Sequence, residues 1–201
     1  GLIAAMYQVL KKGVGSHVQT SLMEAMLDFQ FEVLTTYLNN GKKKPKRSNY
    51  NNAHAYLAAP YGIYKTRDGY IAISMTPVHK LGELINLESI KKYSNQEEWF
   101  TKRDEIKQLI GDFISKNTTQ YWLDILQPAD VWCSEVLEWD KMIEHEGFKV
   151  IDMIQKINRF DGLNIETLRC PIRFNNEILK SEVAAPILGQ HTETISKEFI
   201  L

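Results

Sequence analysis

Residues 59–74, APYGIYKTRDGYIAIS, form two short alternating segments around a polar turn. Ile63, Lys65 and Arg67 alternate with Tyr64 and Thr66, Arg67-Asp68-Gly69 supplies the turn, and residues 70–73 continue as an apolar segment. Two short alternating runs that flank such a turn are typical of a β-hairpin. This hairpin limits the folds open to the chain, because it starts a small antiparallel sheet.

Helical patterns precede the hairpin. Residues 2–12 have helical spacing of apolar side chains and are followed by Gly13, a residue that easily ends a helix. A short strand is predicted over 17–20. The next pattern predicts one helix, which begins with a Ser-x-x-Glu capping box at Ser21 and ends at Gly41.

The pattern after the hairpin mixes helices and strands. It predicts a helix from Thr76 to about Leu87 and helices near 96–116 and 118–126. A short strand is predicted within 129–139, and a brief helix over 139–148 is predicted to end at Gly147. Two strands within 153–174 around Asp161-Gly162 follow, and a C-terminal helix comes after the turn at 189–192. Helices at both ends and a β-rich middle predict an α+β chain rather than a doubly wound domain.

The overall composition excludes some classes of partner. There are 24 Lys and Arg against 25 Asp and Glu, and the net charge is −1. This balance indicates neither a nucleic-acid partner nor an anionic membrane partner. No apolar run approaches the roughly 20 residues that span a bilayer, and the sequence starts without a secretory signal, so we expect a cytoplasmic protein. Gly1 precedes an uncapped helical pattern, which predicts a piece of a longer polypeptide.

A basic run, GKKKPKRSNYNN, occupies residues 41–52 before the hairpin. Five of the six residues from Lys42 to Arg47 are basic, and Pro45 interrupts them. A run of this kind is most often a solvated linker. The functional alternative is attraction of a phosphorylated ligand near the linker.

Recognisable catalytic motifs are missing from the sequence. The phosphate-binding, dinucleotide-binding, zinc-protease and serine-hydrolase signatures do not occur. The five histidines are widely separated, and Cys133 and Cys170 have no metal-ligand spacing, so we expect no metal site and two reduced cysteines. Asp28, Asp68 and Asp130 are predicted to be structural. No catalytic residue is assigned.

Five fragments, taken in order, resemble one family, the class III CoA-transferases, also called CaiB/BaiF. The similarity extends over nearly all 201 residues. The fragments are Gly13-Val14-Gly15 leading into Val18-Gln19-Thr20-Ser21-Leu22-Met23-Glu24-Ala25, Ala59-Pro60-Tyr61-Gly62 with Asp68-Gly69, Ala129-Asp130-Val131-Trp132-Cys133, Arg169-Cys170-Pro171-Ile172-Arg173-Phe174, and Ala185-Pro186-Ile187-Leu188-Gly189-Gln190-His191-Thr192.

The resemblance implies an organisation in two parts. Residues 1–40 are expected to end one part of a large domain, 41–54 to be a linker, 55–182 to form the small domain, and 183–201 to return to the large domain. The predicted fold is a small mixed domain of antiparallel strands and helices, with flanking helices that belong to an incomplete Rossmann-like domain. The family also implies an interlocked homodimer, with neither nucleic acid nor membrane as a partner.

The resemblance implies chemistry on coenzyme A as a substrate. Family members move CoA between an acyl-CoA and a carboxylic acid through an acyl-aspartyl intermediate. The nucleophilic aspartate is expected upstream of residue 1. The segment after the basic run is expected to line the acyl pocket, with Asn51, Asn52, His54 and Tyr56 as substrate-binding residues. The alternative is a surface turn rich in Asn.

Two other functions remain open. The first is an acyl-CoA racemase or hydratase-like member of the same family. Such a member would need an acidic residue at the strand-to-helix junction, which corresponds to residues 74–77 here. Thr76 stands there and cannot act as an acid or base at neutral pH. The second is a non-catalytic interaction or dimerisation module.

Overall fold

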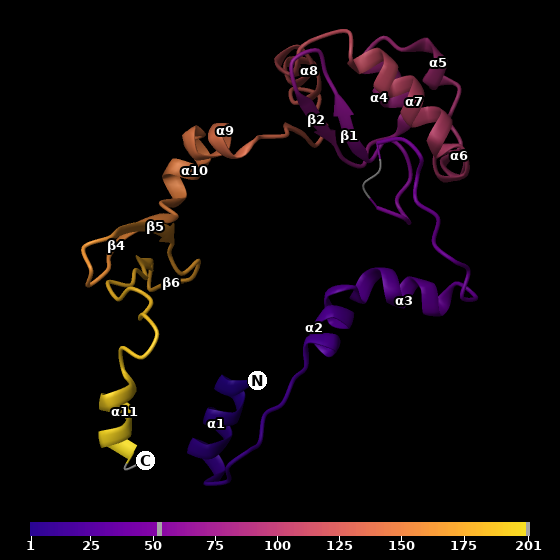
Figure 1. The fold of residues 1–201 in the computed structure, drawn as a ribbon. Coiled ribbons are helices and arrows are strands. Elements are labelled where there is room, and N and C mark those ends of the chain that lie inside the picture. Colours follow the sequence, from indigo (N-terminus) through magenta and orange to yellow (C-terminus); the bar gives the residue numbers. More distant parts are fainter. Residues whose placement is uncertain (52–53, 200–201) are drawn as a thin grey trace. The chain divides into compact units, whose positions relative to one another are not determined.

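The structure is a computed structural model that describes residues 1–51 and 54–199. The chain divides into two compact units, Gly1–Val136 and Leu137–Leu201, and each unit is described separately. Figure 1 follows the chain through its elements. The domain boundaries expected from the sequence remain predictions.

Three helices begin the first unit: α1 (Leu2–Lys12), α2 (Leu22–Phe29) and α3 (Phe31–Asn39). The predicted capping box is confirmed, because the Ser21 hydroxyl accepts from the Glu24 backbone N–H and the Glu24 carboxylate accepts from the Ser21 N–H. Gly13 ends α1 with φ of 67°, as expected for a left-handed cap.

Two expectations for this part were wrong. The single helix predicted from Ser21 is interrupted at Gln30, whose N–H donates to the carbonyl of Leu27, three residues back. A tightened turn of this kind breaks the regular i to i−4 ladder. The strand expected over 17–20 does not form within the described chain, because these residues pair with no neighbouring strand there.

The predicted hairpin is confirmed as β1 (Gly62–Lys65) and β2 (Tyr70–Ile73), which pair antiparallel. The third strand, β3 (Cys133–Glu135), pairs with β2, so the sheet order is β1-β2-β3. Tyr64, Ile71 and Ile73 point into the core and are almost completely buried, in keeping with the period of two along a half-buried strand.

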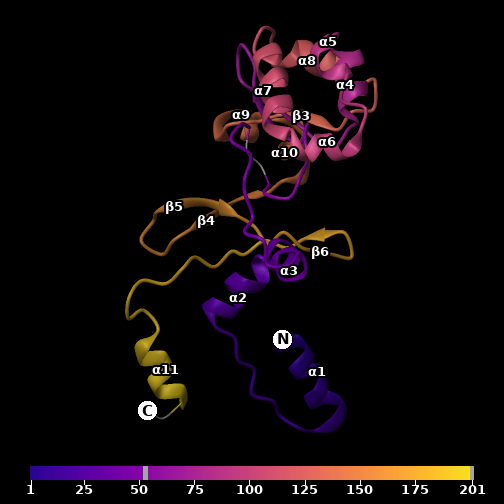
Figure 2. The same cartoon turned by 90° about the vertical axis from the view of Figure 1, so that its right-hand side faces the viewer.

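Five helices pack with this sheet: α4 (Val78–Leu84), α5 (Glu88–Lys91), α6 (Gln96–Thr101), α7 (Arg103–Ile114) and α8 (Thr119–Leu126). Figure 2 shows them gathered around the sheet. The helix predicted to reach Leu87 ends at Leu84, and Asn86 then takes a positive φ of 56°. The helix predicted over 96–116 is interrupted at Lys102. The helix predicted over 118–126 is confirmed.

One continuous core joins the sheet to these helices. Ile106, Ile110 and Ile114 recur at a spacing of four on α7 and are fully buried. Trp122 of α8 is also buried, and its indole N–H donates to the carbonyl of Ile114 at 2.7 Å. The core therefore fixes α7, and the residues of its first turn are held in a defined place.

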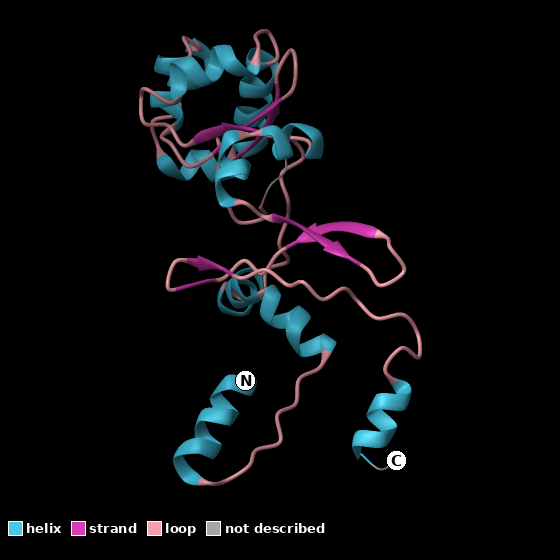
Figure 3. Cartoon of the chain, turned by 90° about the vertical axis from the view of Figure 1, so that its left-hand side faces the viewer, coloured by secondary structure: helices cyan, strands magenta, loops and turns pink. Residues whose placement is uncertain are grey.

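The second unit contains two short helices, two hairpins and a terminal helix. They are α9 (Trp139–Glu144), α10 (Glu146–Ile151), β4 (Ile154–Asn158), β5 (Asn164–Leu168), β6 (Arg173–Phe174), β7 (Glu177–Ile178) and α11 (Thr192–Phe199). Figure 3 distinguishes the strands of these hairpins from the helices. The β4-β5 pair around Asp161-Gly162 and the C-terminal helix are confirmed.

The predicted helix end at Gly147 was wrong. The break lies at His145, which has an extended backbone, and Gly147 lies inside α10. The His145 ring Nδ1 accepts the N–H of Gly147 at 3.1 Å, so this side chain caps a new helix. Within residues 1–51 and 54–199, no helix has both the length and the apolar character needed to cross a membrane.

Candidate functional site

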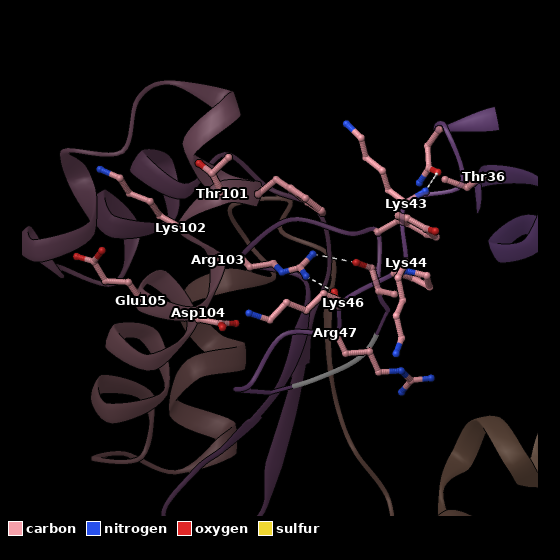
Figure 4. A pocket seen from close by; sticks show the side chains of 15 residues that line it. Thr36, Lys43, Lys44, Lys46, Arg47, Thr101, Lys102, Arg103, Asp104 and Glu105 are labelled. Atoms are coloured by element: carbon pink, nitrogen blue, oxygen red, sulfur yellow. Dashed lines mark hydrogen bonds between the residues drawn. The ribbon is translucent and has the colours of Figure 1, made fainter. Parts of the chain in front are cut away.

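The first turn of α7 holds the basic segment that precedes the hairpin. Arg103 is buried, and its guanidinium donates to the backbone carbonyls of Ala55, at 2.9 Å, and of Lys46. Figure 4 shows this guanidinium reaching between the two carbonyl oxygens. A planar guanidinium suits this role because its donors point in fixed directions. Arg103 thus ties together the two ends of residues 46–55.

Asp104, the next residue of α7, fixes the middle of this segment. Its carboxylate accepts from the Ser48 hydroxyl at 2.7 Å, from the Asn49 N–H at 2.9 Å and from the Asn49 side-chain amide at 2.7 Å. These bonds, with the Ser48 hydroxyl first, hold the pKa of Asp104 below its usual value, although partial burial opposes the shift. Ser48 is buried by this contact.

Lys107 makes the third anchor, one turn further along α7. Its side chain is fully buried, and Nζ donates to the Asn51 carbonyl at 3.5 Å. Burial lowers the pKa of Lys107, and the positive charge of Arg103 lowers it further. The Asn51 amide donates in return to the Lys107 carbonyl at 3.4 Å.

The backbone around Asn51 leaves little room for larger neighbours. Asn51 has a positive φ of 44°, a conformation that Asn tolerates better than most residues. A Cβ atom at Gly62 would lie 2.7 Å from the Asn51 carbonyl oxygen, and one at Gly111 would lie 3.1 Å from its amide nitrogen. Asn51 is therefore committed to the scaffold of α7 and β1.

The other predicted substrate-binding residues have different surroundings. His54 Nδ1 accepts the Tyr56 N–H at 3.2 Å, and His54 Nε2 lies 3.9 Å from a carboxylate oxygen of Glu32 on α3. The Tyr56 hydroxyl is buried and has no hydrogen-bond partner among the described residues. Asn52 lies outside the described residues.

A groove of about 780 Å³ lies along the basic segment. Lys43, Lys44, Lys46 and Arg47 form one side, and the α6–α7 junction forms the other. In Figure 4 the Lys46 side chain runs toward Asp104, whereas Lys44 and Arg47 extend to the opposite side of the segment. The groove is strongly cationic and also includes Tyr56.

A second pocket, of about 390 Å³, shares Tyr56 with the groove. Leu57, Met75 and Trp99 give it a mainly apolar wall. Thr76, at the junction between β2 and α4, also lines it, and none of its lining residues is Asp, Glu or His. Such a pocket can hold an apolar group, and its described lining contains no carboxylate or imidazole for proton transfer.

Sequence reasoning missed Arg103, Asp104 and Lys107 as residues that position the site. Asp104 and its neighbour Glu105 lie in the first turn of a helix, where acidic residues are favoured, so their pattern indicated only a helix start. Within the described ranges, no group of three or more His, Cys, Asp or Glu side chains could hold a metal ion. Cys133 is half-buried, burial raises its pKa, and Cys170 is exposed.

A family model and several relatives relate this chain to the CoA-transferases. A family model described as CoA-transferase family III matches residues 1–192. The (R)-2-hydroxy-4-methylpentanoate CoA-transferase of Clostridioides difficile is 24% identical over 98% of this chain and 50% of its own length. The alpha-methylacyl-CoA racemase of Homo sapiens is 20% identical over 99% of this chain and 51% of its own length.

Solved structures show the same fold. The structure of Rv3272 from Mycobacterium tuberculosis matches with a TM-score of 0.73 at 21% identity, over 96% of this chain and 51% of that one. A CAIB/BAIF family protein from Brucella suis gives a TM-score of 0.68 at 24% identity, over 98% of this chain and 51% of that one. The chain thus spans about half the length of the relatives it matches. The α+β fold expected from the sequence is confirmed.

Proposed function

The chain belongs to CoA-transferase family III, and from this premise we propose that it is the C-terminal portion of an enzyme that moves CoA between an acyl-CoA and a carboxylic acid. The observation that carries the proposal is the family match over residues 1–192, together with a curated CoA-transferase relative over 98% of the chain. The resemblance of five ordered sequence fragments supports the same reading.

In the proposed mechanism an aspartate carboxylate attacks the thioester carbonyl and the CoA thiolate leaves, which forms a mixed anhydride. The thiolate then attacks the aspartyl carbonyl and releases the first acid. An incoming carboxylate attacks the resulting aspartyl thioester, which expels the CoA thiolate and forms a second mixed anhydride. The thiolate then attacks the acyl carbonyl of this anhydride, which gives the new acyl-CoA and frees the aspartate carboxylate. We place the nucleophile outside residues 1–201, in a segment that lies upstream in the sequence.

The environments of three aspartates support this placement. The Asp68 carboxylate accepts the N–H of Thr119 at 2.8 Å and so holds the start of α8. Asp28 is exposed on α2, and Asp130 is an exposed turn residue with φ of 57°. None of these carboxylates lines the groove or the apolar pocket. Asp68 therefore has a structural role, and the other two carboxylates lie exposed outside both cavities.

We propose that the segment containing Asn51, Asn52, His54 and Tyr56 binds the acyl part of the substrate. Tyr56 and Leu57 line the apolar pocket beside Trp99, which suits an acyl chain. The buried Tyr56 hydroxyl lacks a partner among the described residues, so a small shift would let it donate to a carboxylate or thioester oxygen. Asn51 acts mainly through its anchoring to α7.

Racemisation is the alternative chemistry, favoured by the racemase among the relatives. It requires an acid or base next to the thioester. The junction between β2 and α4 carries Thr76, and the pocket there includes no carboxylate or imidazole from the described chain. Transfer is the better proposal for this reason.

A third proposal, a non-catalytic association module, is supported by the exposed apolar residues of α1 and α2.

The test uses the complete polypeptide that contains residues 1–201, purified and incubated with labelled acyl-CoA and a panel of carboxylic acids. We expect label to move to the acceptor acid, and hydroxylamine to trap an acyl-aspartyl enzyme. Residues 1–201 alone should give no transfer. Exchange of the 2-proton with solvent, without any transfer, would favour the racemase instead. We further propose a cytoplasmic homodimer as the working form.

A further inference from the structure

The apolar pocket that shares Tyr56 with the groove is lined, within the described chain, only by uncharged residues. The lining comes from residues 56–59, from residues 75–77 between β2 and α4, and from Gln96 and Trp99 of α6. Its volume of about 390 Å³ is near the lower end of the range for small-molecule sites, which is roughly 300–1,000 Å³. A ligand group that fills this pocket is therefore small, and it meets neither a cation nor a carboxylate from the described residues.

Trp99 gives the pocket an apolar wall that is held in place. Its indole N–H donates to the carbonyl of Tyr93 at 2.8 Å, and its backbone carbonyl accepts the N–H of Ala59 at 2.9 Å. The one polar atom of the Trp99 side chain is thus used inside the protein, so this side chain offers a ligand apolar surface alone. The bond to Ala59 joins two sides of the pocket, and a wall fixed in advance reduces the entropy lost on binding.

The polar side chains of the lining are neutral. The Tyr56 hydroxyl is buried without a hydrogen-bond partner among the described residues, Thr76 carries a hydroxyl and Gln96 an amide. These groups can bond to a carbonyl or hydroxyl oxygen of a ligand, but none of them carries a positive charge. A carboxylate buried beside them would lose its hydration without gaining a cation from this lining, which is strongly unfavourable.

We propose that this pocket selects an uncharged apolar acyl group, so that the enzyme takes acids with one carboxylate and an aliphatic or aromatic tail in preference to dicarboxylic acids. The inference rests on the proposed function, because the acyl group is the part of the substrate that this function places in the pocket. The reacting carboxylate becomes part of the thioester, so an acid with a single carboxylate brings no further charge. The second carboxylate of a dicarboxylic acid would stay charged inside the pocket.

The cationic groove defines the competing class of substrate. Lys44 and Arg47 line it, and Tyr56 lines both cavities, so a second carboxylate could be drawn toward these cations. Both side chains are exposed, however, where water and salt screen their charge. The half-buried lining around Trp99 instead shields an apolar tail from water, which favours the apolar class. Selection of a dicarboxylic acid through the groove is therefore treated as an outcome of the test.

The experiment measures binding to the complete polypeptide by calorimetry, with unreactive ketone analogues in which a methylene replaces the thioester sulfur. One analogue carries the acyl group of 4-methylpentanoyl-CoA. The other carries that of succinyl-CoA, which has a carboxylate where the first has an isopropyl group. We expect the wild-type protein to bind the first analogue about 100-fold more tightly. In a series of unbranched analogues, each added methylene should tighten binding by up to about fourfold until the pocket is filled.

The test variant is Met75→Lys, which adds a cation to the pocket at a residue that is 67% exposed. We expect it to reduce the preference for the 4-methylpentanoyl analogue about tenfold, because the new ammonium can bond to the succinyl carboxylate. Met75→Leu keeps an apolar side chain of similar size and should keep the preference. Gln127→Lys adds the same charge at an exposed position after α8, outside the pocket, and should also keep it.

The outcomes separate this inference from the proposed function, because binding of an unreactive analogue requires no transfer. Equal or tighter binding of the succinyl analogue by the wild-type protein overturns the inference, and its loss in Lys44→Ala/Arg47→Ala would assign the second carboxylate to the groove. The same preference in Met75→Lys as in Gln127→Lys also overturns it, since the acyl group would then lie elsewhere. A strong preference for the apolar analogue in a protein that transfers no acid would refute the function and leave the inference standing.

Discussion

Lys107 and Asn51 are joined by two reciprocal hydrogen bonds, from Lys107 Nζ to the Asn51 carbonyl at 3.5 Å and from the Asn51 amide to the Lys107 carbonyl at 3.4 Å. Both bonds are long. Among the described residues no carboxylate forms an ion pair with this buried lysine, and burial lowers its pKa. Lys107 therefore holds Asn51 in place, but the burial of its charge lowers the free energy of unfolding.

We expect Lys107→Met to raise the free energy of unfolding by up to about 2 kcal/mol at neutral pH, because an apolar side chain of similar size removes a poorly solvated charge. A folded-state pKa below the unfolded one makes wild-type stability increase as pH rises toward about 10.5. The advantage of the variant should therefore shrink as the pH rises from about 7 to about 10. Urea unfolding at several pH values measures this.

The exposed Lys80 of α4 provides the control, since Lys80→Met should show no such pH-dependent difference. A Lys107→Met protein that is less stable than wild type at neutral pH would contradict the prediction. In the complete enzyme the same variant should lose transfer rate, because Asn51 loses its anchor.

Arg103 gives the second prediction. Arg103→Ala removes donors from the carbonyls of Ala55 and Lys46, and we expect the free energy of unfolding to fall by about 1–3 kcal/mol. Trypsin should then cleave the released segment at Lys46 and Arg47 faster, as judged by mass spectrometry of the fragments. The neighbouring Lys102→Ala, which removes an exposed pair with Glu98, should change neither property by much. Equal cleavage rates in all three proteins would refute the anchoring role.

The contrast between these anchors and the hairpin shows what the sequence could predict. The alternation around Asp68 and Gly69 specified β1 and β2, because a strand period is a local property. The break of one predicted helix at Gln30 and of another at Lys102 could not be read locally, since helical spacing of apolar residues continues across both positions.

The site was predictable to a similar degree. The segment from Asn51 to Tyr56 was identified through family resemblance, and the structure brings Tyr56 to two cavities. The three residues of α7 that hold the segment are separated from it by about fifty positions, as in the pairing of Asp104 with Ser48. A single sequence carries no signal for contacts at that separation, and a fully buried lysine runs against the usual preference of that residue.

Acid should destabilise the first unit through Asp104. Hydrogen bonds to its carboxylate lower its pKa in the folded state, so the stability it contributes is fully present above the unfolded pKa of about 3.9 and is lost as the pH falls through the lower folded value. Asp68 should contribute in the same direction, chiefly through the Thr119 N–H. Denaturant unfolding from about pH 6 to about pH 2 should show a smaller decline in Asp104→Asn than in wild type. A parallel decline in both proteins would be contrary to this expectation.

The loop predictions use the complete enzyme. Asn52→Ala and His54→Ala should lower the transfer rate by about 10- to 1,000-fold if one of them stabilises the developing oxyanion. Tyr56→Phe removes a hydroxyl that has no partner among the described residues, so thermal stability should stay equal or rise slightly. A rate loss in Tyr56→Phe at unchanged stability would place the hydroxyl on the substrate. Wild-type rates in all three variants would remove the loop from the acyl pocket, whereas Lys42→Ala, outside it, should leave the rate unchanged.

The last prediction concerns association. Large apolar side chains stand exposed on the helices before the basic segment: Leu10 of α1 is 84% exposed, and Leu22 and Phe29 of α2 are each 87% exposed. Exposed apolar surface of this kind indicates a buried interface in the working protein, so purified residues 1–201 should form species heavier than the 23.2 kDa chain in light scattering. Leu22→Glu/Phe29→Glu should shift the population toward monomer, because a charge in an apolar interface is costly. Thr36→Glu, a polar position on α3, is the matched control and should not. A monomer at all concentrations would exclude these faces as an interface, and dimers that persist in the double variant would assign association to another surface.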